Sequence, residues 1–126
     1  MRNKISSWVR QSRHRAKKHG VVNTLDVQAV LHLVEQFQDT CAYCGETANT
    51  LDHPFPLSAK APNAVANVLP CCHECKTKKG TDDLVAFYGR KGITQDQLVR
   101  LIREMLERDG GEILREHIKG VTGIGL

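Results

Sequence analysis

Five cysteines lie in the middle of the chain, and four of them have the spacing of metal ligands. Cys41 and Cys44 form one CxxC pair, and Cys72 and Cys75 form a second pair after residues 45–71. Two such pairs suit tetrahedral zinc, because the backbone turn within each pair aims both sulfurs at one point. A redox CxxC motif does not usually occur twice in one small chain. The pattern therefore predicts one structural Zn²⁺ with four thiolate ligands and no open position for chemistry.

Two neighbours of Cys72 compete with it as zinc ligands. A pair made by Cys71 and Cys75 would have CxxxC spacing, which zinc accepts less often than CxxC. His73 offers an imidazole at the next position. We expect Cys71 to be an unligated residue at the end of a strand, and His73 to lie outside the zinc ligands.

Between the cysteine pairs, Asp52 and His53 are adjacent in the stretch LDHPFPLS. Successive side chains of a strand point to opposite faces. The two residues therefore serve one centre only if the strand end twists, or if they have different roles at that centre. Taken alone, an Asp-His dipeptide is more often an incidental surface pair.

In its setting, this stretch resembles the HNH, or ββα-metal, nuclease family, in the form held between two zinc-binding pairs. The resemblance covers residues 41–80 and rests on CAYCG, LDHPFPLS, the NVLP segment with Asn67, and CHECKTKKG. The region ahead of CAYCG is similar to the lead-in of small phage-type members. The resemblance implies an α+β fold, in which a small zinc-stapled ββα-metal (HNH) module is flanked by N-terminal and C-terminal helices.

The resemblance also implies a function, that of an endonuclease hydrolysing DNA phosphodiester bonds. His53 would be the general base, Asp52 would bind one divalent cation, Mg²⁺ or Mn²⁺, and Asn67 would hold the loop and orient the imidazole of His53. The chemistry needs a base that is active near neutral pH and a cation that offsets charge on the phosphorane. One such site cuts one strand per binding event, so nicking is the expected product.

Lys76 departs from the pattern of this family. Members generally have Asn or His directly after the last zinc cysteine, as the second protein ligand of the catalytic metal. A protonated lysine cannot bind a cation and would compete with one beside Asp52. Three arrangements stay open: a metal held by Asp52, phosphate and water; His73 as the second ligand; or Lys76 itself offsetting phosphate charge. The last would make the enzyme less dependent on metal or leave an inactive zinc-stapled module that only binds nucleic acid.

The positive charge of the chain is concentrated at its start. Residues 1–20 carry a formal charge of +7, whereas the whole chain of 126 residues carries +4. Such a block usually faces a polyanion such as nucleic acid; its other interpretation is a solvated, partly disordered tail, or a solvated helix face for the later lysines. We expect sequence-independent contacts to DNA phosphates from Arg10, Arg13, Arg15, Lys17, Lys18, Lys78 and Lys79.

The sequence pattern predicts three regions within a single domain. Residues 1–38 form a basic helix that ends at Gly20 and an amphipathic helix that begins after a Thr24 cap. Residues 39–80 form the zinc-stapled HNH module, and residues 81–126 form helices that pack on the module or pair two subunits.

Further helix signals follow the module. Thr81 with the two acids after it predicts a cap, and Thr94 with Gln97 predicts a capping box. A break is expected at Gly110 and Gly111.

The remaining expectations concern location and partners. The chain has no secretory apolar segment and no run of about 18 apolar residues, so we expect a cytoplasmic protein without membrane contact, in a bacterium or a phage-infected host. DNA is the expected partner, with other phage nucleic-acid-processing proteins as further candidates, and the protein is expected to be a monomer or a homodimer. A redox or metal-storage protein is a third function class, which would require reactive thiols.

Overall fold

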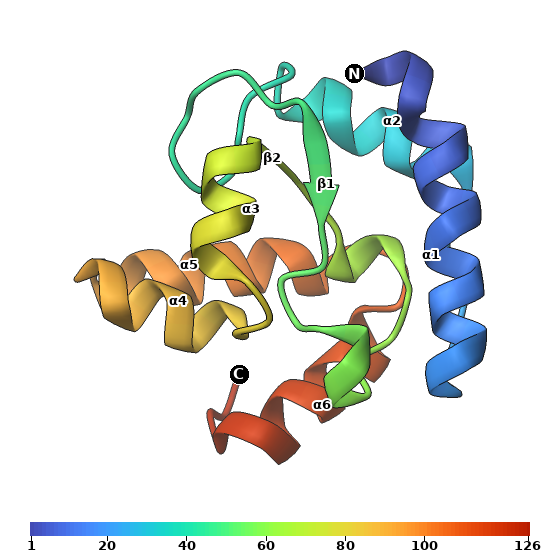
Figure 1. Cartoon of the computed structure of the whole chain (residues 1–126). Coiled ribbons are helices and arrows are strands. Elements are labelled where there is room, and N and C mark those ends of the chain that lie inside the picture. The colour runs from blue at the N-terminus through green and yellow to red at the C-terminus, as the bar shows by residue number, and fades with distance from the viewer.

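The computed structural model describes residues 1–126 as six α-helices and one two-stranded antiparallel sheet (Figure 1). The helices are α1 (Ile5–His19), α2 (Val27–Gln36), α3 (His73–Lys79), α4 (Leu84–Lys91), α5 (Gln95–Leu106) and α6 (Gly111–Thr122). The strands are β1 (Thr50–Asp52) and β2 (Leu69–Cys71), and short 3-10 turns cover Arg2–Lys4, Leu57–Ala59 and Val65–Asn67. The expected mixed α+β class is confirmed.

The N-terminal region forms two helices in contact with one another. α1 ends at Gly20, as expected, because this residue adopts the left-handed conformation (φ 66°) that glycine accepts readily. The predicted Thr24 cap of α2 is wrong. The carboxylate of Asp26 caps the helix by accepting from the Ala29 amide (3.0 Å), while the Thr24 amide donates to the Asn63 carbonyl (3.0 Å).

The sheet places the end of β1 beside the start of α3. β1 pairs with β2 so that Thr50 faces Cys71, and Asp52 faces Leu69. α3 follows β2 after one residue and lies beside the sheet in Figure 1. The C-terminal end of β1 is therefore positioned to meet side chains from α3.

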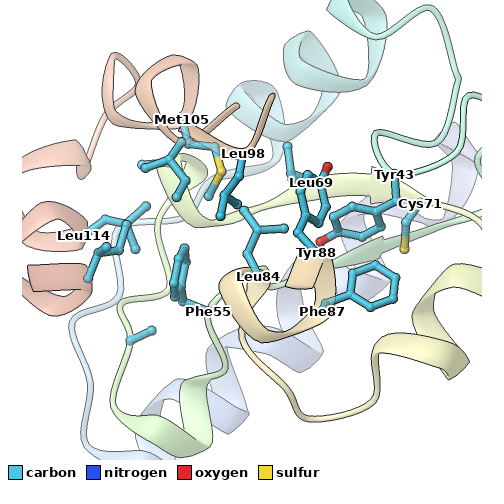
Figure 2. Packing of buried hydrophobic residues seen from close by; sticks show 14 of the residues in the cluster. Tyr43, Phe55, Leu69, Cys71, Leu84, Phe87, Tyr88, Leu98, Met105 and Leu114 are labelled. Carbon is cyan, nitrogen blue, oxygen red and sulfur yellow. The ribbon is translucent and has the colours of Figure 1, made fainter. Parts of the chain in front are cut away.

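Two groups of buried side chains hold these elements together. The first joins the inner faces of α1 and α2 to the sheet and includes Val9, Leu33 and Leu51. The second joins the module to the C-terminal helices and includes Phe55, Leu69, Leu84, Phe87, Met105 and Leu114 (Figure 2). Few of the large apolar residues in this second group belong to the module itself, so α4, α5 and α6 supply the core that residues 41–80 lack.

The ends of the C-terminal helices follow the expected signals in part. Thr94 caps α5 by accepting from the Gln97 amide (3.3 Å), as predicted. α4 begins two residues later than Thr81 suggests, because the carboxylate of Asp83 accepts from the Ala86 amide (2.9 Å). The break before α6 contains Gly110 at φ 85°, where a Cβ would overlap Ala64 of the module.

None of the six helices combines the length and apolar character needed to cross a membrane.

Candidate functional site

The four cysteines of the two CxxC pairs meet at one point. The sulfurs of Cys41, Cys44, Cys72 and Cys75 all lie within 4.8 Å of one another, and Cys44 and Cys72 are 3.8 Å apart. A zinc ion with Zn–S bonds of about 2.3 Å places its tetrahedral sulfur ligands about 3.8 Å apart. The cluster therefore forms a potential metal-binding site whose donor set and spacing suit structural zinc.

The backbone around each pair supports this arrangement. The Tyr43 amide lies 3.4 Å from the sulfur of Cys41, and the Cys75 amide lies 3.4 Å from the sulfur of Cys72. Both amides donate to sulfur, and the hydrogen bond from the Cys75 amide lowers the pKa of the Cys72 thiol, which favours the thiolate form that binds zinc. Cys72 is also the N-cap of α3, so the positive end of that helix adds to the effect.

Cys71 lies outside the cluster. It is fully buried on β2, and burial raises the pKa of its thiol well above the usual value. Its side chain belongs to the apolar group that includes Phe87. The fifth cysteine is therefore a packing residue in the fold, as its place at a strand end suggests.

A separate cavity of about 190 Å³ brings together charged side chains from three elements. Asp52 and His53 enter it at the end of β1, Lys76 and Lys79 from α3, and Arg15 from α1. Its remaining walls come mainly from the segments around Pro56 and Thr81. Three cations and one carboxylate in one small cavity make it a positively charged site suited to an anionic ligand.

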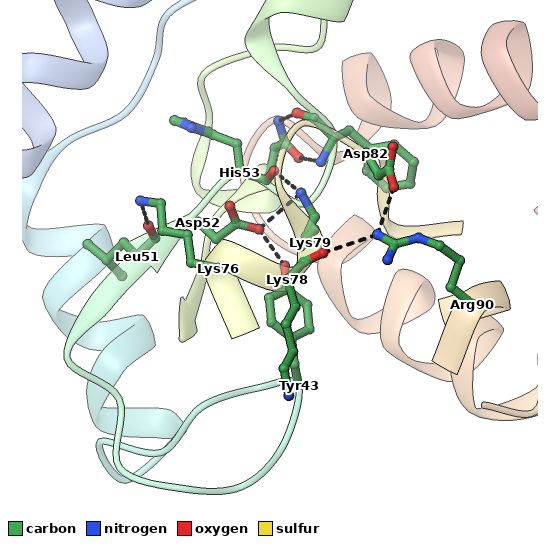
Figure 3. Close-up of polar contacts among 11 residues, drawn as sticks. Tyr43, Leu51, Asp52, His53, Lys76, Lys78, Lys79, Asp82 and Arg90 are labelled. Atoms are coloured by element: carbon green, nitrogen blue, oxygen red, sulfur yellow. Dashed lines mark hydrogen bonds and ion pairs between the residues drawn. The ribbon is translucent and has the colours of Figure 1, made fainter. Parts of the chain in front are cut away.

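Asp52 is held between two buried partners. Its Oδ2 accepts from the Tyr43 hydroxyl (2.7 Å) and lies 3.2 Å from Nζ of Lys79 (Figure 3). The Lys79 ammonium also donates to the His53 carbonyl (3.1 Å). All of these contacts use Oδ2 or the backbone, so Oδ1 is the only protein oxygen of this carboxylate left for a cation.

Lys76 does not make the contact with Asp52 that its sequence position suggests. Its Nζ donates to the carbonyl of Leu51 (2.7 Å), one residue before the aspartate. The lysine that pairs with the carboxylate is Lys79, one turn later on α3 and 2% exposed. Lys79 is thus part of the buried site, not a surface lysine available to the DNA backbone.

His53 is packed against α1. Its ring stacks on Trp8 with 5.0 Å between the centroids, and its Nε2 lies 2.8 Å from Oδ1 of Asn63. Burial lowers the pKa of His53 to about 3, and the positive charges of Arg15, Lys76 and Lys79 act in the same direction. The imidazole is therefore neutral at physiological pH, with one of its two ring nitrogens unprotonated.

Asn67 holds the loop between the strands. Its amide accepts from the Phe55 amide (3.0 Å) and donates to the carbonyls of Phe55 (2.8 Å) and Pro62 (2.9 Å). These three bonds are the loop contacts expected of this residue. None of them reaches the imidazole of His53, whose amide partner is Asn63.

His73 lies in a different cavity from Asp52. It lines a space of about 230 Å³ beside Trp8 and Asn49, and its amide donates to Oδ1 of Asn49 (3.0 Å). The cavity around Asp52 has no contribution from His73. The arrangement in which His73 supplies a second metal ligand thus has no geometric support.

The basic residues expected to bind DNA divide into three kinds. Arg10, Lys17 and Lys18 are exposed on α1. Arg13 is tied to the Leu25 carbonyl (2.9 Å), and Lys78 pairs at the surface with Glu74 (2.8 Å). Arg15 and the buried Lys79 line the cavity, and the guanidinium of Arg15 lies 5.8 Å from the centroid of the Trp8 ring.

Four residues of this site were not foreseen in the sequence: Trp8, Tyr43, Asn63 and the cavity role of Arg15. Tyr43 carried one signal, because it lies inside a CxxC pair whose turn must face the neighbouring strands. Trp8 and Arg15 are seven positions apart, hence on one face of a helix, which links them to each other but not to His53. The contact of Asn63 depends on a loop without periodicity and has no local signal.

Replacement of Tyr43 by phenylalanine should destabilise the zinc-bound protein by about 1.5–3 kcal/mol. The change removes a buried hydrogen bond to a carboxylate and leaves the ring in place. Urea unfolding with saturating zinc measures the effect. Tyr88→Phe is the matched control, because Tyr88 packs on Phe87 as Tyr43 does and its hydroxyl makes no hydrogen bond. Equal stability of the two variants would contradict the role assigned to the Tyr43 hydroxyl.

The sequence matches no protein-family model, and no curated protein or solved structure matches the chain.

Proposed function

We propose that the protein is an HNH-type endonuclease that hydrolyses DNA phosphodiester bonds and nicks one strand at a time. The observation that supports this most is the cavity in which His53, Asp52 and three cationic side chains converge. A phosphodiester needs a base for the attacking water and positive charge around the phosphorane. This cavity provides both kinds of group within one small space.

Each side chain of the cavity has a role in this proposal. His53 accepts a proton from the attacking water, since its imidazole is neutral and stacked in a fixed plane on Trp8. Arg15 and Lys76 offset the charge of the phosphate, Arg15 through its planar guanidinium and Lys76 as a point charge. The anionic phosphate itself would oppose the three cations and raise the pKa of His53 toward the working range.

A divalent cation such as Mg²⁺ has one protein ligand in this cavity, Oδ1 of Asp52. One carboxylate oxygen suits Mg²⁺, which usually keeps several waters and takes the rest of its ligands from substrate phosphate. When bound, the cation would add positive charge beside the phosphate and the leaving oxygen. The ion pair of Asp52 with Lys79 weakens the attraction of this carboxylate for a cation. We therefore expect the nicking rate to depend only weakly on added Mg²⁺.

The exposed arginine and lysines of α1 would bind the DNA backbone beside the cavity. Arg10, Lys17 and Lys18 lie on the helix that also carries Arg15 into the cavity. Contacts of this kind bind the phosphate backbone without reading sequence and weaken as salt rises.

Incubation with supercoiled plasmid tests the proposal directly. Zinc-loaded protein, in buffer freed of other divalent ions over a chelating resin, is compared with the same protein plus Mg²⁺ or Mn²⁺. This avoids a soluble chelator, which would also remove structural zinc. We expect conversion to nicked circles with Mg²⁺ or Mn²⁺, and a slower conversion without them.

The substitution His53→Ala should lower the nicking rate by at least about 100-fold, which is the low end for loss of a general base. His32→Ala is the matched control, because His32 is exposed on α2 away from the cavity. If the wild-type protein leaves the plasmid supercoiled under every metal condition, the proposed function is wrong. Equal nicking by wild type and His53→Ala would point to a contaminating nuclease.

A zinc-stapled module that binds nucleic acid without cutting it is the second candidate. The ion pair between Lys79 and Asp52 favours it, because it occupies the carboxylate on which a catalytic cation depends. This candidate predicts salt-sensitive DNA binding that depends on Arg15 and the exposed basic residues of α1, with intact plasmid in every metal.

A further inference from the structure

A chain of buried polar groups runs from His53 to the backbone of α1. Nε2 of His53 lies 2.8 Å from Oδ1 of Asn63, which is fully buried. Nδ2 of Asn63 donates to the hydroxyl of Ser12 (3.1 Å) and to Oδ1 of Asn23 (3.0 Å). The hydroxyl of Ser12 donates in turn to the carbonyl of Val9 (2.7 Å).

The Val9 carbonyl, at the end of this series of hydrogen bonds, determines the direction of all the others. The Val9 carbonyl can only accept, so the single hydroxyl proton of Ser12 is used there, and the Ser12 oxygen must accept from Asn63. The Asn63 amide therefore turns its NH₂ group toward Ser12 and Asn23. Its Oδ1 faces His53 and can only accept, so Nε2 of His53 must carry the proton.

We infer that Asn63 is a positioning residue, which holds His53 in the Nε2–H tautomer and leaves Nδ1 as the atom that accepts the proton of the attacking water. The inference rests on the proposed role of His53 as the base. Ser12 acts through Asn63, since its hydroxyl determines which end of the Asn63 amide faces the imidazole.

The surroundings of Nδ1 agree with this assignment. Nδ1 has no hydrogen-bond partner in the protein, and His53 lines the cavity. The only side-chain nitrogens or oxygens that are fully buried and lack a hydrogen-bond partner are Trp8 Nε1 and Arg108 Nη1. Because Nδ1 of His53 lacks a partner but is not one of these atoms, it is not fully buried, and its lone pair is accessible. Trp8 fixes the plane of the ring by stacking, and Asn63 fixes its tautomer.

Ring ¹⁵N chemical shifts test the inference on the zinc-loaded protein without requiring any activity. Protein labelled with ¹⁵N-histidine is measured at pH 7.5, and the signals of His53 are assigned by their loss in His53→Ala. We expect a protonated Nε2 and an unprotonated Nδ1 in the wild type. In Asn63→Leu, which removes the acceptor, we expect a mixture of tautomers.

Ser12→Ala is the second variant, because it removes one oxygen from a helix and should fold even if Asn63→Leu does not. Without the Ser12 hydroxyl the Asn63 amide can turn over, so part of the Nδ1–H tautomer should appear. Ser6→Ala, on the exposed face of the same helix, is the matched control and should change neither the tautomer nor the nicking rate.

The kinetic readout separates positioning from binding. Asn63→Leu and Ser12→Ala should lower kcat for nicking by about 10- to 100-fold with little change in KM, because the base is misdirected while the phosphate contacts remain. A wild-type protein that nicks DNA with His53 in the Nδ1–H form would overturn the inference alone. Unchanged tautomer and kcat in both variants would do the same. A wild-type protein that does not nick DNA removes the proposed function, and with it the inference.

Discussion

The substitution Cys75→Ala should abolish zinc binding and the cooperative unfolding of the module. Structural zinc contributes about 10–16 kcal/mol in small zinc-dependent domains, whereas a whole domain is stable by only about 5–15 kcal/mol. Cys75 also packs in the core shared with α4, α5 and α6. Loss of this ligand should therefore disrupt both the metal cluster and the contact of α3 with the C-terminal helices.

Cys71→Ala is the matched control for this prediction. Cys71 is buried four residues earlier in the chain but lies outside the metal cluster, so its loss should leave only a small cavity and cost about 1–2 kcal/mol. Elemental analysis should find one zinc per chain in the wild type and in Cys71→Ala, and none in Cys75→Ala. Thermal unfolding followed by circular dichroism should remain cooperative only in the first two. One bound zinc and a sharp transition in Cys75→Ala would contradict the assignment of this ligand.

The four-cysteine cluster is linked to the cavity through the partners of Asp52. Tyr43 lies between the ligands Cys41 and Cys44, and its hydroxyl holds Asp52 in place. Lys79 comes from the helix that Cys72 caps. One partner of Asp52 therefore lies within a cysteine pair, and the other lies on the helix that begins at the second pair. No cysteine lines the cavity, yet loss of zinc should disorder it.

Local sequence patterns predicted the parts of this site that depend on short-range geometry. The CxxC spacing sets the four sulfurs of the cluster, and Gly20 and Thr94 mark helix ends where backbone geometry demands a glycine or a hydroxyl. The position of Asp52 and His53 at a strand end was likewise readable, because short β-prone segments border the loop.

The wrong or missing parts depend on contacts between distant segments. Residues 76 and 79 lie three apart on α3 and share a face, so spacing alone could not tell which lysine reaches Asp52. Lys78, between them, points to the surface and pairs with Glu74. Asn63 meets Ser12 across an interval that includes α2 and β1, and only the packed structure brings the two together.

The substitution Lys79→Met should destabilise the zinc-loaded protein by about 3–5 kcal/mol, the usual cost of removing one partner from a buried ion pair. The Lys79 side chain is 1% exposed and the Asp52 side chain 7% exposed, so solvent screens the unpaired carboxylate only weakly. Methionine keeps most of the length of the side chain, which limits the change to the ion pair and the bond to the His53 carbonyl. Urea unfolding with saturating zinc measures the loss.

Two variants separate the ion pair from other effects. Lys78→Met removes an exposed lysine of the same helix and should change stability by less than about 0.5 kcal/mol. Asp52→Asn combined with Lys79→Met should cost less than the sum of the two single changes, because neither leaves a buried charge unpaired when the other is present. Additive costs would contradict the ion pair as the source of the effect.

The Lys79→Met protein also reports on the affinity of the cavity for a cation. With its lysine gone, Asp52 loses its ion-pair partner and has only the Tyr43 hydroxyl as a hydrogen-bond donor. Mn²⁺ should therefore restore part of the lost stability in a saturable way, since a ligand that binds only the folded state stabilises it by mass action. Asp52→Asn should abolish this rescue. If Mn²⁺ stabilises Lys79→Met and the Asp52→Asn double variant equally, the cation binds elsewhere, and Asp52 is not the ligand on which the metal-dependent form of the proposed function relies.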